Sequence, residues 1–106
     1  MGDLHTKEMD CLFEIILHLK TKEDCYDLFE DMCTIREMKD MSQRLQVAIM
    51  LDQGMNYQEV SEKTGVSSAT ISRVNRCLNY GSGGYRKAID YINGKDNKKV
   101  KNKKEG

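Results

Sequence analysis

The stretch NYQEVSEKTGVSSATISRVN, residues 56–75, limits the fold of this chain more than any other. Its apolar residues recur at helical spacing on both sides of Gly65, which predicts helices at about 57–64 and 68–80 joined by a tight turn. Gly65 stands where the turn needs a left-handed backbone, and Ser61 is small where the helices come closest. The residues expected to hold the two helices together are Val60, Val66, Ile71 and Val74. We interpret the pair as a helix-turn-helix unit, with an ordinary helical hairpin as the alternative.

The rest of the chain also predicts helices. Its 106 residues include no proline, the strongest interrupter of helices. Thr21 is a candidate N-cap, and Thr34 with Glu37 makes a capping-box pattern. The expected helices lie at about 3–19, in the residues after Thr21, at about 35–40, at about 42–53 and at about 84–92. Gly54 ends the helix at 42–53, and the last helix begins beyond Gly81. We find no convincing strand, so the sequence predicts an all-α fold in a single domain.

The first two predicted helices carry apolar residues at helical spacing, which predicts that each buries one side. These residues are Leu12, Ile15, Ile16 and Leu19 in the first helix and Cys25, Leu28, Phe29 and Met32 in the second. Apolar residues that recur in this way form one stripe along a helix, the usual sign that this side of the helix packs against another element.

Charge is unevenly distributed along the chain although its formal net charge is zero. Residues 1–53, expected to form core and dimerisation helices, hold 6 basic and 12 acidic groups. Residues 54–93, expected to form the helix-turn-helix region and a last helix, hold 5 basic and 3 acidic groups. Residues 94–106 hold 6 and 2, and we expect a disordered basic tail there. An acidic half joined to a basic half favours a polyanionic partner for the second half.

Several classes of function are disfavoured by the residue types. The four cysteines lie 14, 8 and 44 residues apart, which predicts reduced, packed thiols and no metal-binding pair. The two histidines lie too far apart for a metal site on one helix turn. We also see no nucleophile–base pair, so we expect no enzyme, no metal and no cofactor. The chain shows no membrane span or signal pattern, and we expect a cytoplasmic protein.

The segment LQVAIML, residues 45–51, is apolar at six of its seven positions. A small chain cannot easily cover a helix that is apolar on every side. Phe13 and Leu17 also widen the apolar stripe of the first helix. Two chains with interleaved helices would bury the excess apolar surface of both helices, so we predict a homodimer. A compact monomer with a well-packed central helix is the alternative.

The predicted helix after Gly65 carries a polar face without a carboxylate. At ~100° per residue, Ser68, Ser72, Asn75, Arg76 and Asn79 fall opposite Ile71, Val74 and Leu78. Short hydroxyls and a methyl group can approach base edges in the major groove, and arginines can contact phosphates. Gln58 and Tyr57, at the start of the preceding helix, are further candidates for phosphate contacts. The face therefore predicts binding to double-stranded DNA.

The segments SATISRVNRCLNYG and SQRLQVAIML resemble the Trp repressor-like family, in particular its YerC/YecD-type branch, over about residues 12–92. The resemblance implies an all-α Trp repressor-like multi-helix domain that forms an intertwined homodimer with two helix-turn-helix units. It also implies that the start of the recognition helix meets the major groove. The residues expected to bind DNA are Gln58, Ser67, Ser68, Ala69, Thr70, Ser72, Arg73, Arg76 and Asn79.

The resemblance also implies positions for a small-molecule corepressor, which fall here on Thr34, Arg44 and Arg73. However, Val74 stands where the family has a glycine against the indole ring, and Cys77 stands where it has a serine. Asp31 and Cys33 replace leucines that flank the ring. We therefore do not expect tryptophan to bind, while a smaller effector stays open.

Two functions remain from different classes. The first is a sequence-specific transcriptional regulator, by family analogy a repressor, that binds a palindromic operator. The second is a helical adaptor that binds protein or RNA through its basic face. The operator, the regulated genes and the direction of regulation do not follow from the sequence.

Overall fold

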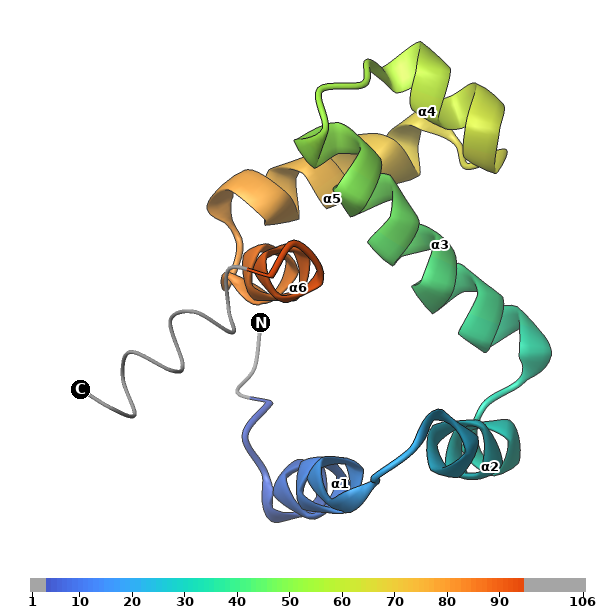
Figure 1. The fold of residues 1–106 in the computed structure, drawn as a ribbon, viewed down its shortest axis with the longest axis vertical. Helices are drawn as coiled ribbons and strands as arrows, with labels where there is room; N and C mark the ends of the chain where they lie inside the picture. Colours follow the sequence, from blue (N-terminus) through green and yellow to red (C-terminus); the bar gives the residue numbers. More distant parts are fainter. Residues whose placement is uncertain (1–3, 95–106) are drawn as a thin grey trace. The chain divides into compact units, whose positions relative to one another are not determined.

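The computed structural model describes residues 4–94, which contain six α-helices and no strand. The helices are α1 (Lys7–His18), α2 (Lys22–Met32), α3 (Ile35–Asp52), α4 (Tyr57–Thr64), α5 (Ser68–Tyr80) and α6 (Gly84–Ile92) (Figure 1). The chain divides into two compact units at Met38 and Lys39, inside α3. We call residues 4–38 the N-terminal region and residues 39–94 the C-terminal region. The predicted tail, apart from Gly94, lies outside the described residues.

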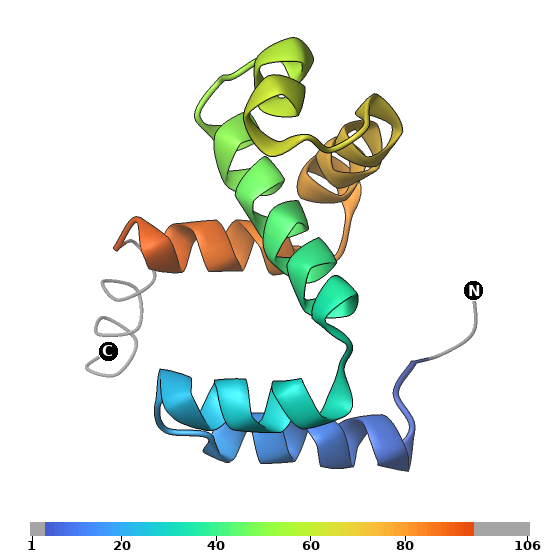
Figure 2. The same cartoon turned by 90° about the vertical axis from the view of Figure 1, so that its right-hand side faces the viewer.

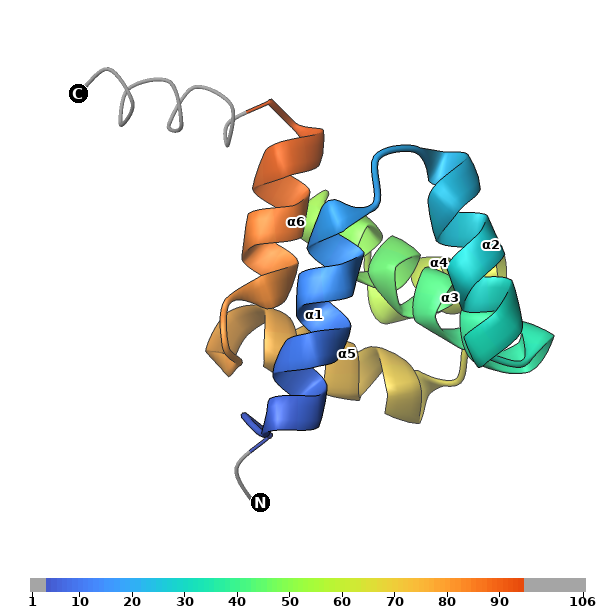
Figure 3. The same ribbon diagram turned by 90° about the horizontal axis from the view of Figure 1, so that it is seen from below.

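Local capping signals define the helices of the N-terminal region. The Thr6 hydroxyl accepts a hydrogen bond from the Met9 amide, so α1 begins later than the expected residue 3. The Thr21 hydroxyl accepts from the Asp24 amide, as predicted. Side-chain oxygens at these positions satisfy amides that have no partner inside the helix. The two helices then run antiparallel, as Figure 2 and Figure 3 both show.

The helices of this region bury less than the sequence predicted. Neither α1 nor α2 contains a buried residue. Leu12, Ile16 and Leu19 are half-buried, but 48% of Ile15 is exposed. In α2, Leu28 and Phe29 are half-buried, whereas Cys25 and Met32 are exposed. Within a single chain, Ile15, Cys25 and Met32 of these stripes are therefore exposed, because the region has no core of its own to receive them.

A single helix, α3, replaces the two helices expected at about 35–40 and 42–53. The predicted capping box at its start is confirmed: the Thr34 amide donates to Glu37, and the Glu37 amide donates to the Thr34 hydroxyl. The polar run between the two expected helices contains neither glycine nor proline. Nothing in it therefore interrupts the helical hydrogen bonds, and the helix continues to Asp52.

The C-terminal region has a well-defined apolar core. Its fully or nearly buried residues come from α3, α4, the turn after it, α5 and α6, and are Val47, Ala48, Val60, Val66, Ile71, Val74 and Ile89. The four residues predicted to hold the two helices of the motif together, Val60, Val66, Ile71 and Val74, are all among them. Val47 and Ala48 come from the apolar segment of α3, which supplies the centre of this core.

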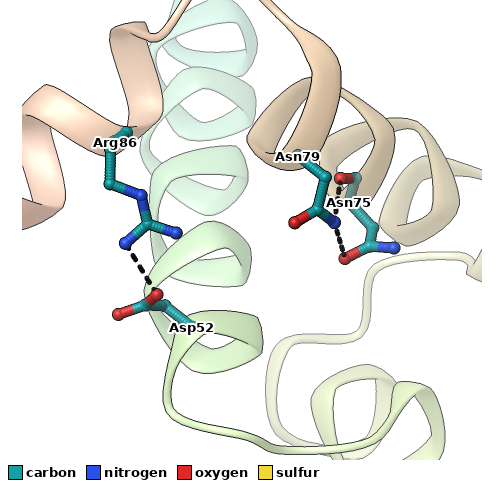
Figure 4. Close-up of polar contacts among 4 residues, drawn as sticks. All are labelled: Asp52, Asn75, Asn79 and Arg86. Atoms are coloured by element: carbon teal, nitrogen blue, oxygen red, sulfur yellow. Dashed lines mark hydrogen bonds and ion pairs between the residues drawn. The ribbon is translucent and has the colours of Figure 1, made fainter.

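The helix α5 packs against both α4 and α6. It ends at Gly81, as predicted, and a Cβ atom in this backbone conformation would clash with the backbone oxygen of Cys77, so a residue with a side chain does not fit there. The next helix is joined to α3 by an ion pair, in which Arg86 Nη1 lies 2.8 Å from Asp52 Oδ1 (Figure 4). Arg86 was one of the basic residues of the second half, and its charge is already matched within the chain.

All four cysteines are free, and within a single chain two of them are not packed as predicted. Cys11 and Cys25 are exposed, while Cys33 and Cys77 are half-buried. The first three lie in or just after α1 and α2, where a single chain buries no residue completely. Helical spacing shows that the cysteines belong to an apolar stripe, but it does not show whether another helix packs against that stripe.

Between Leu4 and Gly94, no helix is long and apolar enough to cross a membrane.

Candidate nucleic-acid interface

The turn between α4 and α5 is held by hydrogen bonds on both sides of Gly65. Gly65 has a φ of 77°, the left-handed conformation that the sequence predicted. The Ser61 hydroxyl donates to the backbone oxygen of Val66 over 3.0 Å. Thr64 uses its hydroxyl twice, donating to the Val60 oxygen and accepting from the Val66 amide. Ser61 was predicted for its small size, and the structure adds that its hydroxyl fixes the turn.

The first turns of α4 and α5 are both capped by side chains. Asn56 and Glu59 form a reciprocal capping box at the start of α4. The Ser67 hydroxyl accepts from the Thr70 amide and donates to the Thr70 hydroxyl, each over 3.2 Å. Gln43 of α3 also donates to the Thr64 backbone oxygen over 3.3 Å. These bonds fix the direction in which α5 leaves the turn.

The exposed side of α5 carries a row of short polar side chains. The row begins at Ser68 and continues four, seven and eleven residues later with Ser72, Asn75 and Asn79. This spacing places the four side chains within about 60° of one another around the helix. Ser68, Ser72 and Asn79 are exposed and Asn75 is half-buried. Ala69 and Arg76 are exposed beside this row. The helix therefore presents hydroxyls, amides and one methyl group without a carboxylate.

Two arginines of α5, Arg73 and Arg76, are exposed and form neither an ion pair nor a hydrogen bond within the described residues. Arg86, by contrast, is paired with Asp52. The unmatched positive charge of the C-terminal region thus includes two side chains on the helix that also carries the polar row. This combination suits a partner with both phosphates and hydrogen-bonding edges.

Two of the predicted DNA-binding residues are placed less favourably for DNA than the others, Thr70 by its position on α5 and Gln58 by its hydrogen bond to an acid. Thr70 is half-buried and lies on the opposite flank of α5 from the polar row, about 160° away from Ser72. Gln58 is exposed at the start of α4, and its Nε2 donates to Glu62 over 3.3 Å. The remaining predicted residues, Ser67, Ser68, Ala69, Ser72, Arg73, Arg76 and Asn79, are all exposed.

A cavity of about 220 Å³ lies between α3 and the start of α5. Thr70 faces it together with Asp40, Gln43, Arg44, Val66 and Ser67. Arg44 is the one residue of the predicted effector set that lines it, and Arg73 is not among the lining residues. Asp40 and Gln43 did not enter the sequence prediction, although both lie within one helical turn of Arg44.

The other residues discussed for an effector lie elsewhere. Thr34 belongs to the N-terminal region, where its hydroxyl caps α3. Val74 is only 2% exposed and belongs to the core, so its side chain occupies space there. Cys77 lines a separate, more open hollow of about 480 Å³ with Gly81, Ser82, Gly84 and Tyr85. The structure brings Arg44 and Thr70 together at one cavity and leaves Cys77 at another.

Within the described residues, no group of three or more histidine, cysteine or acidic side chains could hold a metal ion.

Comparison with known proteins gives a consistent result. The profile of the Trp repressor protein family matches residues 7–93. The uncharacterized protein YerC of Bacillus subtilis is 52% identical over 89 residues, which cover 84% of this chain and 86% of YerC.

Solved structures agree with this relationship. A TrpR-like protein from Eubacterium eligens has a TM-score of 0.82 and 49% identity, covering 85% of this chain and 93% of the other. A Trp repressor candidate from Staphylococcus aureus has a TM-score of 0.81 and 44% identity, covering 85% and 90%. The expected Trp repressor-like, all-α fold is thereby confirmed. The family is one of regulatory DNA-binding proteins and not of enzymes. The chain therefore belongs to the Trp repressor family, in the branch that contains YerC.

Proposed function

We propose that this protein is a sequence-specific DNA-binding transcriptional regulator that acts as a repressor. The observation that carries the proposal is the exposed side of α5, where the short polar row lies beside Arg76 and Arg73 lies farther around the helix, both arginines being unpaired within residues 4–94. In a helix-turn-helix unit the second helix enters the major groove with its N-terminal residues against base edges. Repression as the direction of regulation rests on the family alone.

The residue types of α5 match the chemistry of a DNA groove. Ser68 and Ser72 are short enough to let the helix approach base edges, and the methyl group of Ala69 can contact a thymine methyl. Arg76, the residue after Asn75, is long enough to reach the phosphate backbone. The N-terminal end of α5, where the helix dipole is positive, also favours a phosphate.

We propose that the binding unit is a homodimer. The N-terminal region leaves large apolar side chains in solvent, including Leu17 at 82% and Ile35 at 75% exposure. A second copy of the chain would remove this surface from water, with a gain of about 25 cal/mol per Å² of apolar area. Two α5 helices related by a twofold axis would favour a palindromic site with half-sites about 34 Å apart.

The direct test is selection of binding sites from a library of random duplexes with the full chain. We expect one palindromic motif. Arg76→Ala should weaken binding to every duplex and lower the salt dependence by about one charge, because each phosphate contact releases counterions. Ser72→Ala should instead relax the preference at one or two base pairs.

A matched control separates these effects from net charge. Lys20→Ala removes the same charge from the link between α1 and α2, outside the proposed interface. It should leave the selected motif and the salt dependence unchanged. If Arg76→Ala and Ser72→Ala both remain folded and behave like Lys20→Ala, then α5 does not contact the DNA.

The adaptor hypothesis makes a different prediction in the same assay. An adaptor for protein or RNA would select no duplex motif and would bind single-stranded RNA or a protein at least as well as duplex DNA. A reproducible duplex motif therefore excludes the adaptor hypothesis.

The proposed DNA partner also implies where the protein acts. In bacteria such as those of the relatives, the DNA lies in the cytoplasm, so we propose a cytoplasmic protein.

An effector, where one exists, would be small and polar. The cavity beside α5 is lined by Asp40, Gln43 and Arg44 on one side and by Ser67 and Thr70 on the other. Tryptophan does not fit the proposal, because Val74 is part of the core. Adding tryptophan should therefore leave the affinity for the selected duplex unchanged, and a tenfold increase would contradict this.

A further inference from the structure

Two asparagines of α5 are joined by their side chains (Figure 4). The Nδ2 atom of Asn79 lies 2.9 Å from the backbone oxygen of Asn75 and 3.2 Å from its Oδ1. A backbone oxygen can only accept a hydrogen bond, so the amide nitrogen of Asn79, and not its oxygen, must face Asn75. The orientation of the Asn79 amide is thus fixed by chemistry.

The same geometry fixes the amide of Asn75. Its Oδ1 faces the Asn79 nitrogen, because two amide nitrogens would present donors to each other. The Asn75 nitrogen therefore points away from Asn79 with both hydrogens available. Asn79 keeps its oxygen available as an acceptor, but its nitrogen is engaged by the two oxygens of Asn75.

The pair lies on the polar row of α5, one and two turns beyond Ser72. We infer that Asn75 contacts DNA bases directly and determines specificity, while Asn79 positions it. The inference rests on the proposed DNA-binding function. It assigns the base contact to Asn75, which the sequence placed on the polar face but which was not among the predicted DNA-binding residues, and it gives Asn79, which was among them, the supporting part.

The orientation also selects the base. Asparagine commonly pairs with adenine, donating to N7 and accepting from N6 with one amide. Asn75 does not present that combination, because its oxygen is turned toward Asn79. Its two free hydrogens instead match adjacent acceptors, and in the major groove guanine offers O6 and N7 side by side. Asn75 therefore recognises a guanine.

The test compares Asn75→Ala, Asn79→Ala and the double variant by duplex selection, after melting curves show that each is folded. Asn75→Ala should reduce the preference for guanine at one base pair by roughly tenfold. Asn79→Ala should weaken the preference at that same base pair by less. The double variant should be no worse than Asn75→Ala alone, because the two residues act as one unit.

Side-chain amide NMR of the wild-type protein gives a second measurement that needs no variant. The Asn75 amide signals should shift when the selected duplex is added, and those of Asn79 should stay close to their positions in the free protein. Additive effects at two different base pairs would overturn the inference. A uniform loss of affinity without a change of preference would also overturn it, because that is the behaviour of a phosphate contact.

The failure of this inference is distinguishable from failure of the proposed function. If the wild type selects a motif that neither asparagine affects, only the role of the pair is wrong. If the wild type selects no duplex motif, the DNA-binding function itself is wrong.

Discussion

The N-terminal and C-terminal regions differ in what holds their helices. Each has capped helices and a capping box, at Thr34 with Glu37 and at Asn56 with Glu59. The C-terminal region adds a core in which Val47, Ala48, Val60 and Ile71 are completely buried, whereas α1 and α2 bury no residue. Capping thus determines where a helix begins, and it does not determine what the helix packs against.

Helix length makes this difference important. Isolated helices of the length of α1 and α2, with 12 and 11 residues, are marginal in water even when capped. Most helical stability in proteins comes from packing of the apolar face. The proposed homodimer therefore rests on the exposed apolar residues of the N-terminal region, whereas the C-terminal region already has an apolar core within one chain.

The largest expected effect is a charge in the core of the C-terminal region. Ala48→Glu would place a carboxylate where the side chain is 0% exposed, without an ion-pair partner among the core residues. Burial of an unpaired charge costs several kcal/mol, which is a large part of the stability of a small domain. We expect loss of cooperative unfolding in thermal denaturation at every protein concentration. A folded Ala48→Glu variant that only separates into monomers would contradict this.

The second prediction concerns the exposed apolar surface of the N-terminal region. Leu17→Glu should shift the protein toward a species of about 12.2 kDa in sedimentation and lower its melting temperature most at low concentration. The side chain is 82% exposed in one chain, so the substitution costs little unless a second chain covers it. Lys22→Glu, a charge reversal at another exposed position of the region, serves as the control.

A result that contradicts this prediction is easily recognised. A wild-type protein that sediments as a folded 12.2 kDa species at micromolar concentration would exclude the homodimer. The two regions would then differ in stability within one chain, with α1 and α2 frayed.

Much of the fold follows from the sequence because its signals are local. Gly65, Asn56 and Ser67 set the bounds of α4 and the start of α5, which agree with the expected residues, and each acts through a backbone group beside it. The predicted division of α3 into two helices was wrong. A polar run was interpreted as an interruption although it contains no residue that breaks a helix. The exposure of Ile15, Cys25 and Met32 within one chain was not predicted. Helical spacing identifies the apolar face of a helix, but it does not identify the element that packs against this face.

The candidate site was only partly predictable for a related reason. The exposed polar face of α5 follows from helical periodicity, and Ser68, Ser72 and Arg76 were found this way. The role of Asn75 depends on how two side chains orient each other, which spacing alone does not give. Similarly, Thr70 lies at the first turn of α5 as expected, yet it faces the cavity with Arg44.

The third prediction compares one cap from each region. Asn56→Ala and Thr21→Ala should each cost about 1 kcal/mol, because each removes the acceptor of a helix-terminal amide. In hydrogen exchange, Thr21→Ala should speed exchange within α2 selectively, because no buried residue of that helix resists local opening. Asn56→Ala should instead lower the protection of the whole C-terminal region, since Val60 ties α4 to the core. Equal local effects in both regions would remove the proposed difference between them.

The smallest expected effect concerns the ion pair that joins α3 to α6. The side chains of Arg86 and Asp52 are 44% and 27% exposed, so water and salt screen their attraction despite the 2.8 Å separation. Arg86→Met should therefore lower the free energy of unfolding by about 0.5 kcal/mol, and Asp52→Asn by a similar amount. The double variant should cost little more than either, and the difference from wild type should shrink in 1 M salt, where the screening length is about 3 Å. A loss above about 2 kcal/mol that salt does not reduce would mean that the pair, and not the apolar core around Ile89, holds α6 in place.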